Sequence, residues 1–250
     1  MPIRIRALDT NTVAKLLALN KAFYSRFANA FSASRGKAEP GLLRLLHSVK
    51  PGARVLDLGC GNARVAQLLP PGCSYTGIDF SPELLRSTAP PPHLVSYRLL
   101  VADLVQDAWV KGLTARFDWI VIRAVLHHIP DYANRRAVLS QAISLSSPDG
   151  YLILANWQFD RLPRLLQRAV PWSAIGLSED DAEDGDMLLD WRRDGHGIRY
   201  VHLVTRQETL RLAEESGATV VEMFQSDGHT GDLTLYALLR PRCMSDTVDR

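Results

Sequence analysis

Apolar residues in the middle of the chain form short continuous runs that alternate with segments of helical spacing. The runs at 53–58, 74–79, 95–101, 117–123 and 151–157 predict buried strands, because turn residues bound each of them. Helical spacing between the runs predicts helices at 62–69, 81–87 and 132–146. Such alternation is typical of an α/β fold with a mostly parallel sheet covered on both faces, whose strands end at one common edge.

The flanks of this region follow other patterns. Before it, residues such as Leu16, Phe23 and Phe27 recur at helical spacing and predict a helix over 12–31, followed by another over 41–49. We interpret residues 1–50 as an N-terminal helical cap. After it, a strand at 199–204, a helix at 206–216 and strands at 218–225 and 232–239 are expected. The last two strands leave no room for a helix between them, so they should pair as an antiparallel hairpin.

The pattern breaks between 158 and about 198. Arg161, Arg164 and Arg168 fall on one side of a short predicted helix, and the acidic stretch at 179–184 is expected to be mobile. We interpret residues 158–204 as an insertion that lies as a lid over the strand edge. The whole chain, 1–250, is then a single domain with this insertion.

Composition narrows the class of protein without indicating an activity. With 250 residues, of which 46% are apolar and 22% charged, the chain is expected to fold as a globular domain. A net charge of +2 neither requires nor excludes a nucleic-acid partner. The three cysteines have no metal-ligand spacing, and no apolar run has the length of a signal peptide or a membrane span. We therefore expect a cytoplasmic protein without a metal site or a membrane partner.

The first predicted strand ends in an acid and a Gly-x-Gly turn, which together indicate a nucleoside ligand. Asp57 lies where its carboxylate can accept hydrogen bonds from an ammonium group. Glycines in the turn let a ligand approach the backbone, because they have no Cβ. The predicted cofactor site takes from this turn Gly59, Cys60, Gly61 and Asn62. A dinucleotide fold would need a third glycine where the chain has Arg64, so S-adenosylmethionine is the favoured ligand.

Acids also follow the second and third predicted strands. Asp79 can hold two ribose hydroxyls, and Phe80 after it can pack against a purine. Asp103 can accept a hydrogen bond from the adenine amine beside the backbone of Leu104. Ser81 is included in the predicted cofactor site. The alternative interpretation is that Asp79 caps a helix beginning at Ser81 and that Asp103 caps a turn.

The fourth predicted strand leads into a loop that should face the reacting methyl group. From this loop the predicted cofactor site takes Arg123, Ala124, Val125 and His128. The adjacent His127 and His128 point in different directions, so we expect no shared metal. Proton transfer by His128 is an alternative, but we interpret this histidine as a packing and hydrogen-bonding residue.

The motifs VLDLGCG, GIDFSPELL, VADL, FDWIVIRAVLHHI and SPDGYLIL stand in this order over residues 53–157. In this set the chain resembles the class I S-adenosylmethionine-dependent methyltransferases. The resemblance implies a doubly wound, mostly parallel, seven-stranded Rossmann-like sheet with an antiparallel C-terminal hairpin. It also implies S-adenosyl-L-methionine as the cofactor and methyl transfer as the reaction.

The flanking segments carry a narrower resemblance. FSASR at 31–35, AVLHH at 124–128, NW at 156–157, GDMLLDW at 185–191 and RYVH at 199–202 are similar in order to segments of the tRNA wobble-uridine carboxymethyl methyltransferases. The chain departs from that family in having Ala30 for a histidine, Ser34 for a threonine, Gly36 to Pro40 for a Trp and Lys-Pro segment, and Arg123 for a small serine. These departures concern the acceptor rather than methyl transfer itself.

A carboxymethyl acceptor would place particular demands on the site. Its carboxylate is already ionised at pH 7, so it needs cations to orient it rather than a strong base. Arg35 and Arg199 are the candidate cations, and Trp157, Tyr200 or Trp191 could stack on a flipped base. The alternative is that both tryptophans belong to the core and that the arginines at 161, 164 and 168 form a solvated face.

Three functions stay open at this point. The first is a tRNA-modifying methyltransferase, for which tRNA and a small activating subunit are candidate partners. The second is a methyltransferase that acts on a carboxylate, amine or hydroxyl of a small metabolite. The third is a cofactor-binding scaffold that activates a partner without catalysis, which the intact glycine turn and acids disfavour. The sequence predicts no oligomeric state.

Overall fold

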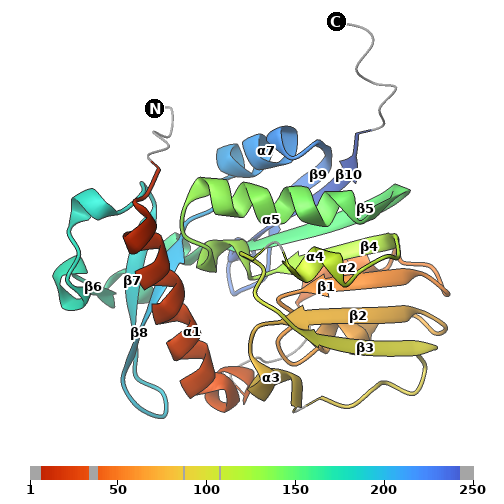
Figure 1. Cartoon of the computed structure of the whole chain (residues 1–250), viewed down its shortest axis with the longest axis horizontal. Coiled ribbons are helices and arrows are strands. Elements are labelled where there is room, and N and C mark those ends of the chain that lie inside the picture. Colours follow the sequence, from red (N-terminus) through yellow and green to blue (C-terminus); the bar gives the residue numbers. More distant parts are fainter. Residues whose placement is uncertain (1–6, 34–38, 87, 107, 243–250) are drawn as a thin grey trace, which may run out of the picture.

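The computed structural model describes residues 7–33, 39–86, 88–106 and 108–242, and a seven-stranded sheet runs through them (Figure 1). The strands lie in the order β3-β2-β1-β4-β5-β10-β9. Their bounds are Arg54–Leu58 for β1, Ser74–Asp79 for β2, Ser96–Val101 for β3, Phe117–Arg123 for β4, Ser146–Trp157 for β5, Ala218–Ser226 for β9 and Thr234–Pro241 for β10. From β3 through β5 all neighbours are parallel, whereas β10 is antiparallel to both β5 and β9. The predicted α/β sheet with its antiparallel hairpin is confirmed.

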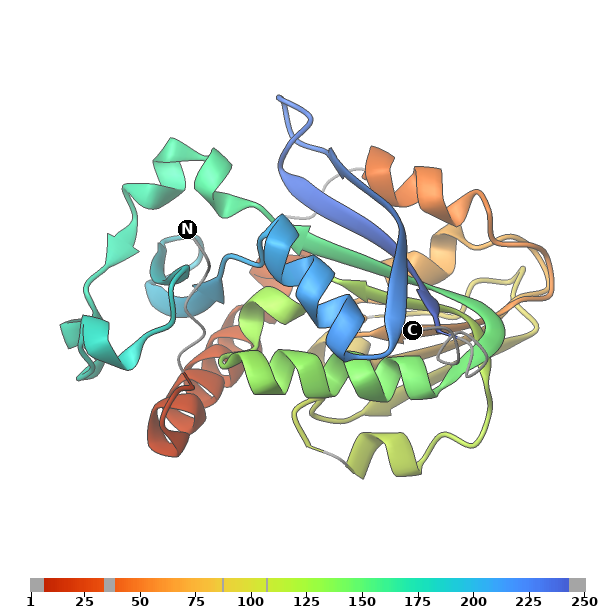
Figure 2. The ribbon, with the colours of Figure 1, turned by 90° about the horizontal axis from the view of Figure 1, so that it is seen from above.

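Helices cover both faces of the sheet, because the inner strands are apolar on both sides. Along β1, Leu56 and Leu58 pack in one buried cluster, and Val55 packs in the other. The first cluster lies under α4 (Ala108–Lys111), α5 (Tyr132–Ser144) and α7 (Arg206–Glu215). The second lies under α2 (Pro40–Leu46), the 3-10 helix Arg64–Leu68 and α3 (Pro82–Arg86). Figure 2 shows α5 and α7 on one side of the sheet and α2 on the other.

A second, smaller sheet lies beyond the ends of the central strands. It consists of β6 (Ala169–Val170), β7 (Asp186–Trp191) and β8 (Gly197–His202), which are antiparallel, and we call it the cap sheet. The long helix α1 (Thr10–Ala33) packs against it through Leu16, which belongs to the same buried cluster as Leu188 and Tyr200. Asn20 fixes this contact, because its amide accepts from the Tyr200 N–H and donates to the Tyr200 carbonyl. The helix therefore joins the cap sheet to the rest of the molecule.

Segments between β5 and β7 are short. They comprise the 3-10 helix Phe159–Arg161, α6 (Pro163–Leu166) and the 3-10 turns Trp172–Ile175 and Glu179–Asp181. The predicted short helix is thus only four residues long. Arg161, Arg164 and Arg168 are exposed, which agrees with the alternative that they form a solvated face.

The predicted insertion contains more regular structure than the sequence indicates. Strands β6 and β7 lie within it, and two of its acids form specific contacts. Ser178 and Asp181 form a reciprocal capping box, and the buried Glu183 accepts from Arg135 at 2.9 Å. The sequence obscures this because Arg135 lies 48 residues from Glu183, so the acid run resembles a solvated loop.

Smaller differences concern element boundaries. The helix predicted at 62–69 is a short 3-10 helix, since Ala63 before it has a left-handed φ of 51° and two prolines follow it. The strand predicted from 151 begins at Ser146, and the strand predicted at 199–204 is β8, which ends at His202.

None of the described helices combines the length and the apolar character that a membrane-spanning segment needs.

Candidate active site

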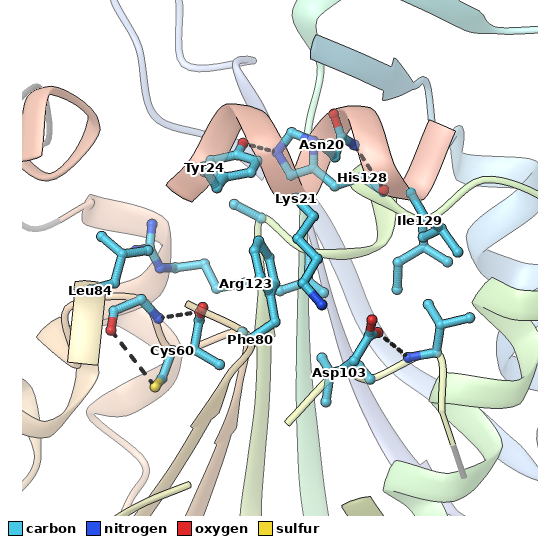
Figure 3. A pocket seen from close by; sticks show the side chains of 18 of the residues that line it. Asn20, Lys21, Tyr24, Cys60, Phe80, Leu84, Asp103, Arg123, His128 and Ile129 are labelled. Carbon is cyan, nitrogen blue, oxygen red and sulfur yellow. Dashed lines mark hydrogen bonds between the residues drawn. The ribbon is translucent and has the colours of Figure 1, made fainter. Parts of the chain in front are cut away.

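A cavity of about 340 Å³ lies between the ends of the central strands and α1 (Figure 3). Its volume falls in the range of small-molecule sites, which is roughly 300 to 1,000 Å³. The sheet side contributes Gly59, Cys60, Gly61, Asn62, Asp79, Phe80, Leu84, Asp103, Leu104, Val105, Arg123, Ala124, Val125, His128 and Ile129. The α1 side contributes Leu17, Ala18, Asn20, Lys21 and Tyr24. All of the predicted cofactor residues except Asp57 and Ser81 therefore line one cavity.

The glycine turn brings the backbone to the cavity wall. Gly59 and Gly61 have positive φ values of 65° and 55°. A Cβ on Gly59 would lie 2.3 Å from Cγ2 of Val125, so only glycine fits there. At Gly61 no described atom beyond the glycine and its two chain neighbours lies within 4 Å of the Cβ position, and the space is open. A ligand can therefore approach the backbone at Gly61.

Asp79 combines the two roles that the sequence left as alternatives. Its Oδ2 accepts from the Gly61 N–H at 2.8 Å and its Oδ1 from the Ser81 N–H at 2.9 Å, so it braces the glycine turn. It also lines the cavity. Burial raises the pKa of this carboxyl, although the backbone hydrogen bonds act in the opposite direction. The carboxylate thus lies where a ribose hydroxyl could donate to it.

Ser81 does not line the cavity, in contrast to the sequence prediction. It is fully buried, and its hydroxyl accepts from the Leu84 N–H at 3.3 Å in the first turn of α3. This is the position of a helix-capping residue. Ser81 supports Asp79 through its own N–H instead of facing a ligand.

Asp57 also lies outside the cavity wall. It sits inside β1 between β2 and β4, is only 2% exposed, and accepts from the Tyr75 hydroxyl at 2.7 Å. Burial raises the pKa of its carboxyl to about 7, although the Tyr75 hydrogen bond and the charge of Arg123 lower it. The structure therefore places Asp57 behind the glycine turn, and not on the cavity wall where it was predicted to accept hydrogen bonds from an ammonium group of the ligand.

Asp103 lies at the end of β3, on the wall of the cavity. Its Oδ1 accepts from the Val105 N–H at 3.0 Å, which holds the loop in place and leaves Oδ2 for a ligand. Figure 3 shows Asp103 and Cys60 on opposite sides of the cavity, with Phe80 between them. An adenosine with its amine near Asp103 and its ribose near Asp79 would fit this arrangement.

The α1 side of the cavity was missed by the sequence analysis. Leu17, Lys21 and Tyr24 follow the spacing of one helix face, and the same face includes Asn20. That spacing was a usable signal, but it was attributed to core packing alone. In Figure 3 the Lys21 side chain extends from α1 into the cavity.

His128 is held between the cavity and the cap sheet. Its Nε2 lies 2.6 Å from the Tyr24 hydroxyl, and its Nδ1 lies 3.3 Å from the Tyr200 carbonyl oxygen. If Nδ1 carries the proton and donates to the carbonyl, Nε2 accepts from Tyr24. The Asn20 amide donates to the His128 carbonyl at 3.0 Å. These contacts suit the packing and hydrogen-bonding role that we predict for His128.

Arg199 lies in a group of aromatic rings on the cap side of the same edge. Its guanidinium carbon lies 5.1 Å from the Trp157 ring centroid, 5.6 Å from that of Phe23 and 5.5 Å from that of Trp191. The residue is 7% exposed. Within the described ranges, its Nε has no hydrogen-bond partner and no acid forms an ion pair with it. A buried guanidinium of this kind can bind an anion from outside the chain.

The other predicted acceptor residues have different positions. The prediction that Tyr200 contacts the methyl acceptor is wrong, because this residue is fully buried and its hydroxyl donates to Asp186 at 2.6 Å. Adjacent residues of a strand face opposite sides, so Arg199 and Tyr200 cannot face the same ligand. Trp157 is half-buried beside Arg199, as expected. Arg35 lies outside the described residues, so its predicted role stays a prediction.

The glycine turn, two cavity acids and the open space at Gly61 fit an adenosine-bearing cofactor. A family profile described as a methyltransferase domain matches residues 31–223. The chain belongs to this methyltransferase family. It is a class I S-adenosylmethionine-dependent methyltransferase, and the predicted enzyme class and cofactor are confirmed.

Relatives of the methyltransferase act on different acceptors. The tRNA (carboxymethyluridine(34)-5-O)-methyltransferase of Arabidopsis thaliana is 28% identical over 157 residues, which are 62% of this chain and 37% of the relative. The ubiquinone biosynthesis O-methyltransferase of Xanthomonas campestris is 33% identical over 125 residues, 48% of each chain. The chain thus spans about half or less of these two relatives.

Among solved structures, the S-adenosylmethionine-bound amino pentose methyltransferase of calicheamicin biosynthesis from Micromonospora echinaspora is similar to this methyltransferase. Its TM-score is 0.55 at 18% identity, and the match covers 84% of this chain and 95% of that one. This likeness shows the fold. It does not indicate the acceptor.

Proposed function

We propose that the enzyme transfers a methyl group to an anionic acceptor, with the carboxymethyl group of a tRNA wobble uridine as the favoured example. The observation that carries the proposal is the buried Arg199 guanidinium, which lacks an acidic partner among the described residues. Leaving a buried charge unpaired is unfavourable, so this position favours a ligand that supplies the counter-charge. A carboxylate matches the fork of an arginine.

The chemistry needs little acid–base assistance. When bound, the cofactor supplies an electrophilic methyl group on a cationic sulfur. A carboxylate acceptor is already ionised near pH 7. The task of the chain is therefore to orient the acceptor, exclude water and align the reacting atoms. Arg199 fixes the orientation, and the rings around it restrict the access of water.

The aromatic rings also support a base as part of the acceptor. Trp157 lies at the end of β5, and its ring centroid is 6.0 Å from that of His127. A flipped uracil could stack on such a ring while its carboxymethyl group reaches Arg199. The Arabidopsis relative supports this acceptor, since its name specifies carboxymethyluridine.

Nucleoside mass spectrometry of tRNA tests this proposal. We expect the methyl ester of carboxymethyluridine to be lost from bulk tRNA when the gene is deleted, and to return with the wild-type gene. Methyl transfer to purified tRNA should fall steeply with salt, because phosphate contacts release counterions. Unchanged tRNA nucleosides after deletion, together with turnover of a small metabolite at a salt-independent rate, would contradict the proposal.

A hydroxyl acceptor is the second candidate, and one observation favours it. The Tyr24 hydroxyl lies 2.6 Å from Nε2 of His128 beside the cavity, so the pair could take a proton from a hydroxyl group. The Xanthomonas relative is named as an O-methyltransferase. With a carboxylate acceptor, His128→Gln should lower the rate modestly and leave the pH profile unchanged. A loss of about four orders of magnitude, with a profile that follows a group of pKa about 6.5, would favour the hydroxyl acceptor.

A further inference from the structure

Arg123 brings a positive charge to the wall of the cofactor cavity. It is the last residue of β4, and it lines the cavity. Its Nη1 donates to both carboxylate oxygens of Glu39, at 2.9 and 3.0 Å. The side chains of Arg123 and Glu39 are 16% and 26% exposed, so the ion pair is largely removed from bulk water. Both bonds use Nη1, and within the described residues Nε and Nη2 are left for a ligand.

Glu39 is fixed in place by the start of α2, which it precedes. The Gly41 N–H donates to Oδ1 of Asp227 at 3.0 Å, and the Tyr236 hydroxyl donates to Oδ2 of the same carboxylate at 2.6 Å. A Cβ on Gly41 would lie 2.3 Å from the Tyr236 ring, so the helix approaches the sheet closely. The carboxylate of Glu39 therefore holds the Arg123 guanidinium in a defined orientation.

Arg123 lies at the end of the cavity where an amino-acid group would be. In the strand order β3-β2-β1-β4, Asp103 follows β3, Asp79 ends β2 and Arg123 ends β4, so Asp103 and Arg123 lie at opposite ends of this row of strands. In Figure 3 the Arg123 side chain extends toward the side where Cys60 lies, away from Asp103. Its charge also acts on Asp57 behind the glycine turn, where it lowers the pKa of the carboxyl. An adenosine placed by the two acids would thus direct its 5′ substituent toward Arg123.

We propose that Arg123 binds the carboxylate of the methionyl part of S-adenosylmethionine, and that Glu39 is a positioning residue that keeps the guanidinium directed into the cavity. The remaining edge of the guanidinium matches a carboxylate in a two-point contact. Glu39 supplies the counter-charge when the cavity holds no ligand, and this keeps the arginine oriented before binding. The arrangement depends on an arginine at position 123.

Two ligands that differ only in the carboxylate test the proposal by calorimetry. For Arg123→Met we expect about 10- to 100-fold weaker binding of S-adenosylmethionine, the cost of one charge-assisted contact. Binding of decarboxylated S-adenosylmethionine should stay within about twofold of the wild type. An equal loss for both ligands would mean that Arg123 only supports the cavity, and no loss for either would remove it from the site. Either result overturns the proposal.

Glu39 is tested by a double-mutant cycle. Glu39→Gln should weaken the binding of S-adenosylmethionine less than Arg123→Met does. The double variant should bind this ligand no more weakly than Arg123→Met alone. Additive losses would show that Glu39 acts independently of Arg123 and would overturn its positioning role. Arg44→Met is the matched control, because Arg44 pairs with Glu222 on the exposed side of α2. This variant should bind both ligands as the wild type does.

Discussion

The cofactor cavity and the cap sheet use charged residues in opposite ways. In the cavity, Asp79 and Asp103 accept hydrogen bonds from backbone N–H groups of nearby turns and keep capacity for a ligand. Behind the cap sheet, charged side chains bind one another and are almost fully buried. The first arrangement is local and leaves oxygen atoms for a ligand, whereas the second joins distant segments of the chain through ion pairs. Burial of charge therefore indicates a binding site only where the partners are absent.

The buried network shows how completely the second group is satisfied. Arg135 on α5 donates to Glu183 at 2.9 Å and to Glu208 on α7 at 2.8 Å. The imidazole of His202 lies 2.8 Å from Glu208 and 2.7 Å from Asp186. Although burial by itself lowers the pKa of His202, hydrogen bonds to these two acids raise it above its usual value. The network connects two sheet-covering helices to the cap sheet.

The largest effect should come from breaking this network. Arg135→Met removes the arginine that two buried carboxylates share, so the free energy of unfolding should fall by about 3 to 5 kcal/mol. Arg136→Met is the matched control on the next residue of α5, where a half-exposed ion pair with Glu215 contributes at most about 1 kcal/mol. Urea denaturation measures both variants. Equal losses would show that the network does not differ from a surface pair.

A smaller effect is expected in the cavity. Asp79→Asn keeps one acceptor for the glycine turn but removes the charge, and should weaken S-adenosylhomocysteine binding by about 2 to 3 kcal/mol. Asp149→Asn is the control, since that carboxylate is 91% exposed and pairs with Arg240. Calorimetry that gives the wild-type affinity for Asp79→Asn would remove this residue from the ribose position.

The two regions should also lose stability in different pH ranges. The pKa of Asp57 is raised from 3.8 to about 7, so its contribution is present below about pH 4 and is lost as the pH rises to 7. The pKa of His202 is raised from 6.5, so its contribution is lost only above that pH. Each loss amounts to at most about 1.4 kcal/mol per pH unit. Urea denaturation from pH 4 to 9 should show the first slope abolished in Asp57→Asn and the second in His202→Gln; slopes that persist in both variants would contradict this assignment.

Local patterns explain why the cavity could be predicted from the sequence. Gly59, Asp79 and Asp103 each follow an apolar run, and parallel strands bring such positions to one edge. Asp57 was misplaced because a carboxylate near a strand end can lie behind the turn as well as in front of it. The sheet itself was predictable for the same reason, including its antiparallel hairpin.

The cap region could not be predicted in this way. Glu183 reaches its partner across 48 residues, and Tyr24 meets His128 across 104, so no local pattern reveals either contact. Arg199 and Tyr200 were both predicted to contact the acceptor, but neighbouring residues of a strand face opposite sides, and this rule was available from the sequence. Only the three-dimensional structure shows that the buried Nε of Arg199 has no hydrogen-bond partner among the residues described.

Arg199 gives the most direct test of the account, in which the strand edge holds the cofactor and Arg199 holds the acceptor. S-adenosylhomocysteine affinity and methyl transfer to tRNA from cells lacking the gene should be measured on Arg199→Met, with the exposed Arg192→Met as control. We predict an affinity within about twofold of the wild type and a transfer rate lower by about 100-fold. Equal losses of affinity and rate, or a wild-type rate in the variant, would contradict the account.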